Sequence, residues 1–265
     1  MYHEVEEASK VDKRYTLSEV AFKNHLRYLQ EQEFQTVLLN RDWNAAKVEA
    51  LAAKGHEVAI TFDDSHINHF ANSLPLLQRY QARATFFVVT SLVGADRAWL
   101  DRNQLAALAK AGMAVQSHTH THRFLDVLGP NDLRDELLRS KQLLEDWLGL
   151  PVQHLSCPGG RYNRRVLGVA EEVGYHTVST SVPGLARPAR LGDITVLPRF
   201  LITSGTTQAQ FEHAVFADAA YIRRRRTAYT ARHVVKRCLG DQLYQRLWQS
   251  LSRSDEAKTA SMREE

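Results

Sequence analysis

Short apolar runs alternate with amphipathic stretches along most of the chain. The runs are rich in β-branched and aromatic residues, as in VAITF at 58–62, which is typical of buried strands. Strands are predicted at residues 1–5, 36–39, 58–62, 84–89, 113–117, 153–156, 177–181 and 194–197. Between them, apolar positions recur at the spacing expected for one face of a helix. Helices are predicted at residues 18–30, 44–53, 67–80, 101–111, 131–148 and 163–174.

The order of these elements predicts the fold class. A strand followed by a helix, repeated five or more times with short connections, indicates an α/β fold with a parallel sheet and helices outside it. Seven or eight strands favour a closed or nearly closed barrel, and an open doubly wound sheet is the alternative. Neither G-x-G-x-x-G nor a P-loop follows any strand, so nucleotide-binding folds lose their main support. We expect residues 1–216 to form this domain and residues 217–265 to form a basic helical extension.

The extension carries most of the positive charge. Residues 221–265 hold 11 Lys/Arg and 5 Asp/Glu, a net charge of +6 within a total of +4, so residues 1–220 carry −2. The run from Arg223 to Arg226 is suited to an anionic lipid surface or another acidic partner, and a solvated helix end is the alternative. No zinc-finger spacing or aromatic-interleaved basic stripe is present, so no nucleic-acid partner is expected.

Composition and the lack of a visible targeting signal narrow the class of protein further. With 265 residues, 44% apolar and 24% charged, the chain is neither collagen-like nor wholly disordered. Its apolar runs fall far short of the ~18 residues of a membrane span, and no secretory signal opens the sequence. Two cysteines, Cys157 and Cys238, make no disulfide framework. We therefore expect a protein that is cytoplasmic or peripheral to the inner membrane.

Unusual polar residues follow three of the predicted strands. In parallel α/β folds, active residues gather at the carboxyl ends of strands. Here those ends are followed by an acidic pair, by three histidines within five residues, and by a Gly-rich segment. These segments are Asp63-Asp64, His118-Thr119-His120-Thr121-His122 and Cys157-Pro158-Gly159-Gly160-Arg161.

The acidic pair and the histidine run together have the composition of a catalytic metal site. His118 and His122 are four positions apart, so on one helical turn both imidazoles face the same way. In an extended segment, all three histidines would instead share a face. Two imidazoles and one carboxylate leave positions on a divalent ion for water and substrate. The second aspartate is then placed to take a proton from water in the hydrolysis of a carbonyl compound. The structural alternatives are a helix cap and packed histidines.

Three motifs in this order and spacing resemble those of a known family. The segments T-F-D-D, S-H-T-H-T-H and S-C-P-G-G-R-Y-N are similar to those of the polysaccharide deacetylases of the NodB-homology type, carbohydrate esterase family 4. The resemblance extends from about Tyr2 to Phe200. It implies a distorted (β/α) barrel with about seven parallel strands and metal-dependent removal of N-acetyl groups from amino sugars. It also implies one divalent metal ion, with zinc as the first choice and cobalt, nickel or iron as alternatives.

The resemblance assigns roles to individual residues. Asp63 matches the general base, and the metal ligands match Asp64, His118 and His122. His120 has no assigned role. The part of the third motif that this chain retains is Pro158, Gly159, Gly160 and Arg161. The resemblance implies that this segment binds the oxyanion or the substrate. A backbone N–H near Gly159 is the expected oxyanion donor.

The chain also departs from the family pattern. Ser65 stands where the first motif continues with Gly, and Ser156 stands where the third motif has an Arg that orients the base. No Asp-Trp motif occurs near residues 179–184, and Leu197-Pro198-Arg199 replaces the final Leu-x-His that supplies the general acid. His3 and Arg199 are the candidates for this missing role, the latter only by electrostatic assistance. Cys157 is interpreted as a packing residue.

These observations define a leading function and two alternatives. We expect a metal-dependent hydrolase that removes N-acetyl or O-acetyl groups from a saccharide or glycan, with Asp63 as base. The alternatives are an amidase of the same fold acting on a non-sugar substrate, and a catalytically impaired carbohydrate-binding module. The aromatic residues Trp99, Phe124 and Tyr162 either stack on sugar rings or pack internally. Arg161 either meets an acidic group of the substrate or caps local structure.

Overall fold

The computed structural model describes residues 1–11, 14–40, 50, 55–186, 189–191 and 194–239. The chain divides into two compact units, Met1–Asp218 and Ala219–Glu265, which are described separately. The helix predicted at 44–53 lies outside the described residues except for residue 50, and so does the part of the basic extension beyond residue 239.

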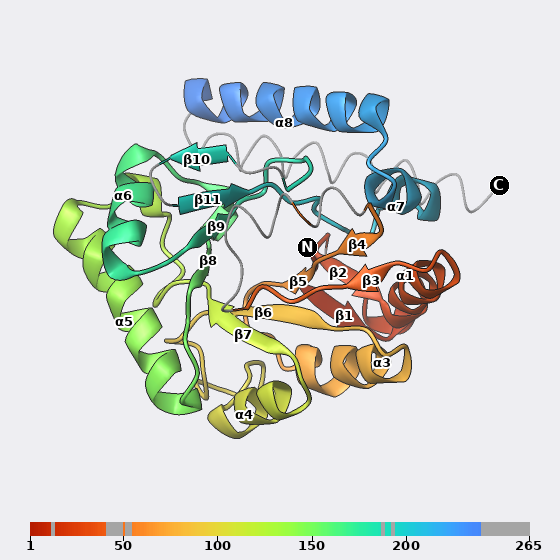
Figure 1. Cartoon of the computed structure of the whole chain (residues 1–265), viewed down its shortest axis with the longest axis horizontal. Helices are drawn as coiled ribbons and strands as arrows, with labels where there is room; N and C mark the ends of the chain where they lie inside the picture. Colours follow the sequence, from red (N-terminus) through yellow and green to blue (C-terminus); the bar gives the residue numbers. More distant parts are fainter. Residues whose placement is uncertain (12–13, 41–49, 51–54, 187–188, 192–193, 240–265) are drawn as a thin grey trace. The chain divides into compact units, whose positions relative to one another are not determined.

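The first unit is built around one curled, mostly parallel sheet (Figure 1). Its strands are β5 (Ile60–Phe62), β6 (Ala84–Val88), β7 (Ala114–Ser117), β8 (His154–Ser156), β9 (Thr177–Ser179), β10 (Ala189–Leu191) and β11 (Ile194–Leu197). They lie in the order β10-β11-β9-β8-β7-β6-β5, and all neighbouring pairs except β10 with β11 are parallel. The predicted α/β architecture is confirmed in the form of a half-barrel of six parallel strands.

The main sheet has seven strands, and six of them are parallel. β10 pairs antiparallel with β11, because only two residues connect them and a parallel pair needs a long crossover. The strands predicted at 1–5 and 36–39 form two small pairs beside the main sheet, and Tyr2 joins the first of them to β5 through a parallel bridge to Phe62. In these pairs, β1 (Glu4–Glu6) pairs with β2 (Thr16–Ser18), and β3 (Gln35–Thr36) pairs with β4 (Glu57–Val58).

The six parallel strands are buried on both faces. Every residue of β5, β6, β7, β8, β9 and β11 is buried, as expected for a parallel sheet that helices cover. Phe62 stacks on Phe86 with ring centroids 5.0 Å apart, so neighbouring strands share one aromatic core. This rigid sheet fixes where the carboxyl ends of its strands meet.

Helices cover the outer side of the sheet in Figure 1. They are α1 (Glu19–Glu31), α3 (Leu74–Arg79), α4 (Arg102–Lys110), α5 (Pro130–Leu148), α6 (Arg164–Val173) and α7 (Gln208–Val215). The predicted starts follow from capping: Asp101 forms a capping box with Gln104, and Asn163 accepts a hydrogen bond from the Val166 amide. The helix predicted at 67–80 begins with a π-helical turn, His69–Ser73. Short 3₁₀ turns lie at Ala8–Lys10, Leu125–Val127 and Pro158–Gly160.

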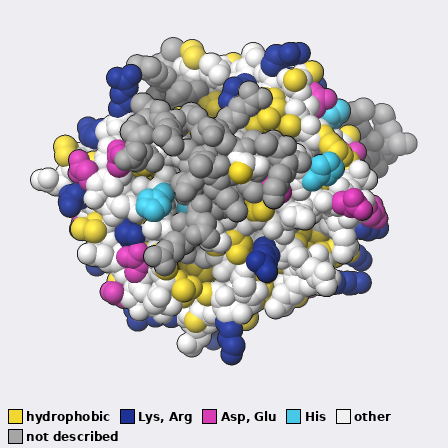
Figure 2. All heavy atoms as spheres, viewed as in Figure 1, with side chains coloured by type: hydrophobic (Ala, Val, Ile, Leu, Met, Phe, Trp, Pro, Cys, Tyr) yellow, Lys and Arg dark blue, Asp and Glu magenta, His cyan; other side chains and the backbone are white. Residues whose placement is uncertain are grey.

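The described part of the second unit is one helix, α8 (Ala219–Leu239). Arg223, Arg224 and Arg226 are exposed on it. Figure 2 shows Lys and Arg side chains scattered over this face of the molecule, several of them beside Asp or Glu side chains. No helix within the described residues has the length and apolar composition needed to cross a bilayer.

Candidate active site

The ends of β5 and β7 bring the predicted metal ligands together. These strands flank β6 in parallel, so the segments that follow them emerge at the same edge of the sheet. Oδ1 of Asp64 lies 3.2 Å from Nε2 of His118 and 3.2 Å from Nε2 of His122. One ligand atom from each residue lies within 4.8 Å of the others. The three side chains therefore form a compact carboxylate–imidazole cluster.

The cluster has the properties of a site for a divalent cation. Oδ1 of Asp64 is buried and has no hydrogen-bond partner among the described residues, although two imidazole nitrogens face it. Two nitrogens and one carboxylate oxygen are a donor set that zinc accepts in catalytic sites. The exposed fraction of the side chain rises from 3% for His118 to 25% for Asp64 and 40% for His122. The cluster is thus anchored in the core and opens to solvent beside His122.

Hydrogen bonds orient the histidine segment. Nδ1 of His118 lies 2.8 Å from the carbonyl oxygen of Ser156, which can only accept, so Nδ1 carries the proton and Nε2 points to Asp64. The His122 amide donates to Thr119 Oγ1 at 3.1 Å. The buried carboxylate of Glu136, on α5, accepts from both the amide and the hydroxyl of Thr121. The loop is therefore held on both sides of His120 and directly before His122.

The backbone around the ligands adopts uncommon conformations. Asp64, Ser65, Thr119 and His122 have φ values of 83°, 69°, 71° and 61°, in the left-handed region that favours glycine. Ser65 occupies this conformation where the family pattern has Gly. Its buried hydroxyl accepts the Val89 amide at 2.8 Å, which offsets part of the backbone cost. The serine thus ties the acidic pair to the end of β6.

Asp63, the predicted base, lies in a buried ion pair. Arg199 Nη1 donates to Oδ1 and Nη2 donates to Oδ2, both at 2.8 Å, and Ser156 Oγ donates to Oδ2 at 2.9 Å. Burial raises the pKa of Asp63. Arg199, His118 and His3 together outweigh burial and hold this pKa below its usual range. The carboxylate is therefore ionised. From the sequence, Arg199 was a candidate only for the role of the missing general acid. Its pairing with Asp63 was not predicted.

The neighbouring titratable groups respond to the same carboxylates. Burial lowers the pKa of His118, but Asp63 and Asp64 more than offset this effect and raise it above its ordinary value. Nε2 of His3 lies 4.0 Å from Oδ2 of Asp64, and burial lowers the pKa of this imidazole. His3 is thus near enough to the cluster to remain the candidate acid. His120 contacts Thr90 Oγ1 at 2.8 Å instead and is not part of the cluster.

The segment after β8 lies in a tight turn. Gly160 has a φ of 69°, and a Cβ there would collide with the Ser181 backbone nitrogen. Its amide donates to the Cys157 carbonyl at 2.8 Å, so this N–H is already used, and Pro158 has none. An oxyanion role for Gly159 remains a prediction. The thiol of Cys157 is buried and its pKa is raised to about 12, in agreement with packing.

Arg161 and the candidate aromatic residues have packing partners. Nε of Arg161 lies 3.0 Å from both carboxylate oxygens of Asp126, and the guanidinium lies 4.6 Å from the centre of the Phe124 ring. The Trp99 ring packs against the His66 ring in a tilted arrangement, with ring centroids 4.7 Å apart. Contact of these residues with a substrate remains a prediction.

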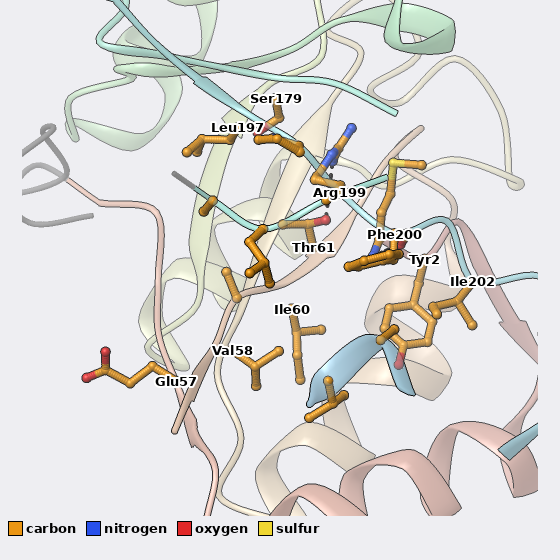
Figure 3. A pocket seen from close by; sticks show the side chains of 18 of the residues that line it. Tyr2, Glu57, Val58, Ile60, Thr61, Ser179, Leu197, Arg199, Phe200 and Ile202 are labelled. Carbon is orange, nitrogen blue, oxygen red and sulfur yellow. Dashed lines mark hydrogen bonds between the residues drawn. The ribbon is translucent and has the colours of Figure 1, made fainter. Parts of the chain in front are cut away.

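A separate apolar cavity of about 200 Å³ lies where β5 faces the segment after β11 (Figure 3). Thr61 and Arg199 line it and share a hydrogen bond of 3.2 Å, whereas Asp63 and the metal-ligand cluster do not line it. Arg199 therefore separates this cavity from the carboxylate that it binds.

Comparison with known proteins defines the class. Residues 50–178 match the sequence model described as polysaccharide deacetylase. The putative polysaccharide deacetylase YxkH of Bacillus subtilis is 27% identical over 211 residues, which cover 80% of this chain and 73% of that relative. A peptidoglycan-N-acetylglucosamine deacetylase of Bacillus cereus is 32% identical over 124 residues, 46% of this chain and 54% of that relative.

Solved structures agree in fold. The Streptococcus pyogenes deacetylase PplD, in complex with acetate, superposes with a TM-score of 0.71 at 24% identity, over 81% of this chain and 96% of that one. The polysaccharide deacetylase BC0361 of Bacillus cereus superposes with a TM-score of 0.69 at 22% identity, over 81% of this chain and 67% of that one. In sequence over residues 50–178, and in fold, this chain is similar to the polysaccharide deacetylases. Its curated relatives are named deacetylases, and on that likeness the chain is a hydrolase that acts on carbon–nitrogen bonds.

Proposed function

We propose that this chain removes N-acetyl groups from an acetylated saccharide or glycan, with Asp63 as the general base. The observation that carries the proposal is an ionised carboxylate beside the ligand cluster: Oδ2 of Asp63 lies 3.9 Å from Nε2 of His118. A general base must be ionised and within reach of the water that it deprotonates. A binding module has no need for such a group, so this arrangement argues against that alternative.

The residues of the site divide the work of amide hydrolysis. Asp64, His118 and His122 would hold one divalent cation, zinc by its donor set, and the cation would polarise the acetyl carbonyl and acidify water. Asp63 accepts the proton of the attacking water. The departing amine needs a proton in return, and His3 is our candidate for it. Unchanged turnover of His3→Ala would remove that candidate.

The names of the relatives suggest a first substrate to test. Besides the peptidoglycan-N-acetylglucosamine deacetylase, a poly-β-1,6-N-acetyl-D-glucosamine N-deacetylase of Staphylococcus aureus is 27% identical over 119 residues, 43% of this chain and 40% of that relative. Both names specify N-acetylglucosamine units of a glycan. We therefore propose a glycan containing N-acetylglucosamine as the substrate of this chain.

Metal content and acetate release test the proposal together. Elemental mass spectrometry should find about one divalent ion per wild-type chain. His122→Ala should lose this ion, whereas the control His120→Ala, on the same loop but outside the cluster, should keep it. Acetate should be released from N-acetylglucosamine oligomers faster than from O-acetylated xylan or a non-sugar acetanilide. Absence of metal from a supplemented wild-type protein would overturn the proposal, and a preference for the other substrates would favour the corresponding alternative.

A further inference from the structure

The carboxylate of Asp63 and the guanidinium of Arg199 form a closed, fully buried arrangement. The two residues lie 136 positions apart, Asp63 after β5 and Arg199 after β11, and their exposed fractions are 2% and 8%. The guanidinium meets the carboxylate with two parallel N–H···O bonds of 2.8 Å, one to each oxygen. This bidentate geometry fixes direction as well as charge, which a lysine ammonium does not do.

Every donor of the guanidinium has an acceptor. Nε donates to the Thr180 carbonyl at 3.0 Å. Nη1 donates to Thr61 Oγ1 at 3.2 Å as well as to Asp63, and Nη2 donates to Ser156 Oγ at 2.7 Å as well as to Asp63. An arginine has five N–H groups, and these contacts use all five. Arg199 therefore has no N–H left for a substrate.

Ser156 completes the arrangement. Its hydroxyl accepts from Arg199 Nη2 and donates to Asp63 Oδ2 at 2.9 Å, so it links both partners. Its side chain is small enough to leave the space beside Asp63 to the guanidinium, which enters from the opposite end of the sheet. With these contacts, Oδ2 accepts two hydrogen bonds from the described residues and Oδ1 accepts one.

We propose that Arg199 is the positioning residue of the proposed base. Its bidentate contact holds the Asp63 carboxylate in one orientation, and the small side chain of Ser156 leaves room for the guanidinium. This inference rests on the proposed function, because it assumes that Asp63 acts as base. Face contact with the Phe87 ring, 5.4 Å from the guanidinium carbon, supports the same fixed placement.

The test compares Arg199→Ala and Arg199→Lys with Arg134→Ala, which removes an exposed arginine paired with Glu172 at 3.4 Å. We expect kcat for acetate release to fall ~10²-fold or more in Arg199→Ala and about tenfold in Arg199→Lys, with little change in KM, because a misplaced base loses most of its contribution. Arg134→Ala should match the wild type. Metal content should stay near one ion per chain in all of them.

Chemical rescue separates positioning from a merely structural role. Millimolar methylguanidinium should restore a measurable part of kcat in Arg199→Ala and none in Asp63→Asn. A folded, metal-loaded Arg199→Ala that is fully active, or that guanidinium does not rescue, would overturn the inference. If Arg199→Ala does not fold, the test rests on Arg199→Lys, which cannot make the bidentate contact with Asp63. Full activity of this variant would overturn the inference. An inactive wild-type protein would instead refute the proposed function.

Discussion

Replacement of Glu136 tests whether a buried carboxylate on α5 holds the histidine loop in place. The side chain is 4% exposed and accepts hydrogen bonds from the Thr121 amide and from the Thr121 hydroxyl, at 2.9 Å and 3.1 Å for the latter. Thr121 directly precedes the ligand His122, whose φ of 61° is unfavourable without such support. We therefore expect Glu136 to contribute to stability and to metal affinity.

The hydrogen bonds of Glu136 set the expected loss of folding stability. A hydrogen bond to a charged group contributes about 1.5–3 kcal/mol, and an orphaned buried N–H costs about 1–3 kcal/mol. Glu136→Gln keeps the shape and one acceptor, so it should cost about 2 kcal/mol, whereas Glu136→Ala should cost about 4 kcal/mol. For a domain of this size, 1 kcal/mol shifts the melting temperature by roughly 2–4 °C. Alanine is a good helix former, so the loss does not come from α5 itself.

Thermal unfolding followed by circular dichroism and chelator competition for zinc provide the readouts. The expected shifts are roughly 4–8 °C for Glu136→Gln and 8–16 °C for Glu136→Ala, with metal affinity ~10–100-fold weaker. Asp135→Asn is the control, since Asp135 precedes Glu136 on the same helix and is exposed. If Glu136→Ala melts within about 2 °C of this control and binds zinc equally well, the carboxylate does not hold the loop.

Three further predictions concern groups outside the metal-ligand cluster. Burial lowers the pKa of His25 and of His154 to about 4. Between pH 6.5 and pH 4 the unfolded chain therefore binds more protons than the folded protein, so the stability of the fold decreases as the pH is lowered. At pH 5 the loss should be about 2 kcal/mol for each histidine, and His154→Gln should flatten the measured dependence of stability on pH. Cys157, with its pKa raised to about 12, should resist iodoacetamide at pH 8 until the protein is unfolded, as peptide mass spectrometry would show; rapid native labelling would contradict its burial. We also propose that α8 binds anionic lipid: replacement of Arg223 to Arg226 by glutamine should weaken binding to phosphatidylglycerol vesicles about fivefold for each arginine, and equal binding would refute it.

Local sequence determined the elements and the ligand segments. Short continuous apolar runs identified the parallel strands because each strand is buried on both faces, and Asp101 and Asn163 marked helix starts because their side chains cap free amides. The acidic pair and the histidine run stood out because carboxyl ends of parallel strands share one edge of a sheet. The resemblance to the deacetylase motifs then singled out Asp64, His118 and His122, and the structure brings these three side chains together.

Tertiary structure decided what surrounds those residues. Arg199 reaches Asp63 across 136 positions, and Glu136 reaches Thr121 from the middle of a helix, so no local spacing indicates either contact. The strands predicted at 1–5 and 36–39 resembled sheet strands in sequence, yet β1 and β3 pair with β2 and β4, and Tyr2 meets the main sheet through a bridge to Phe62. Periodicity reports how a residue is buried, but which side chain it meets depends on how the elements pack.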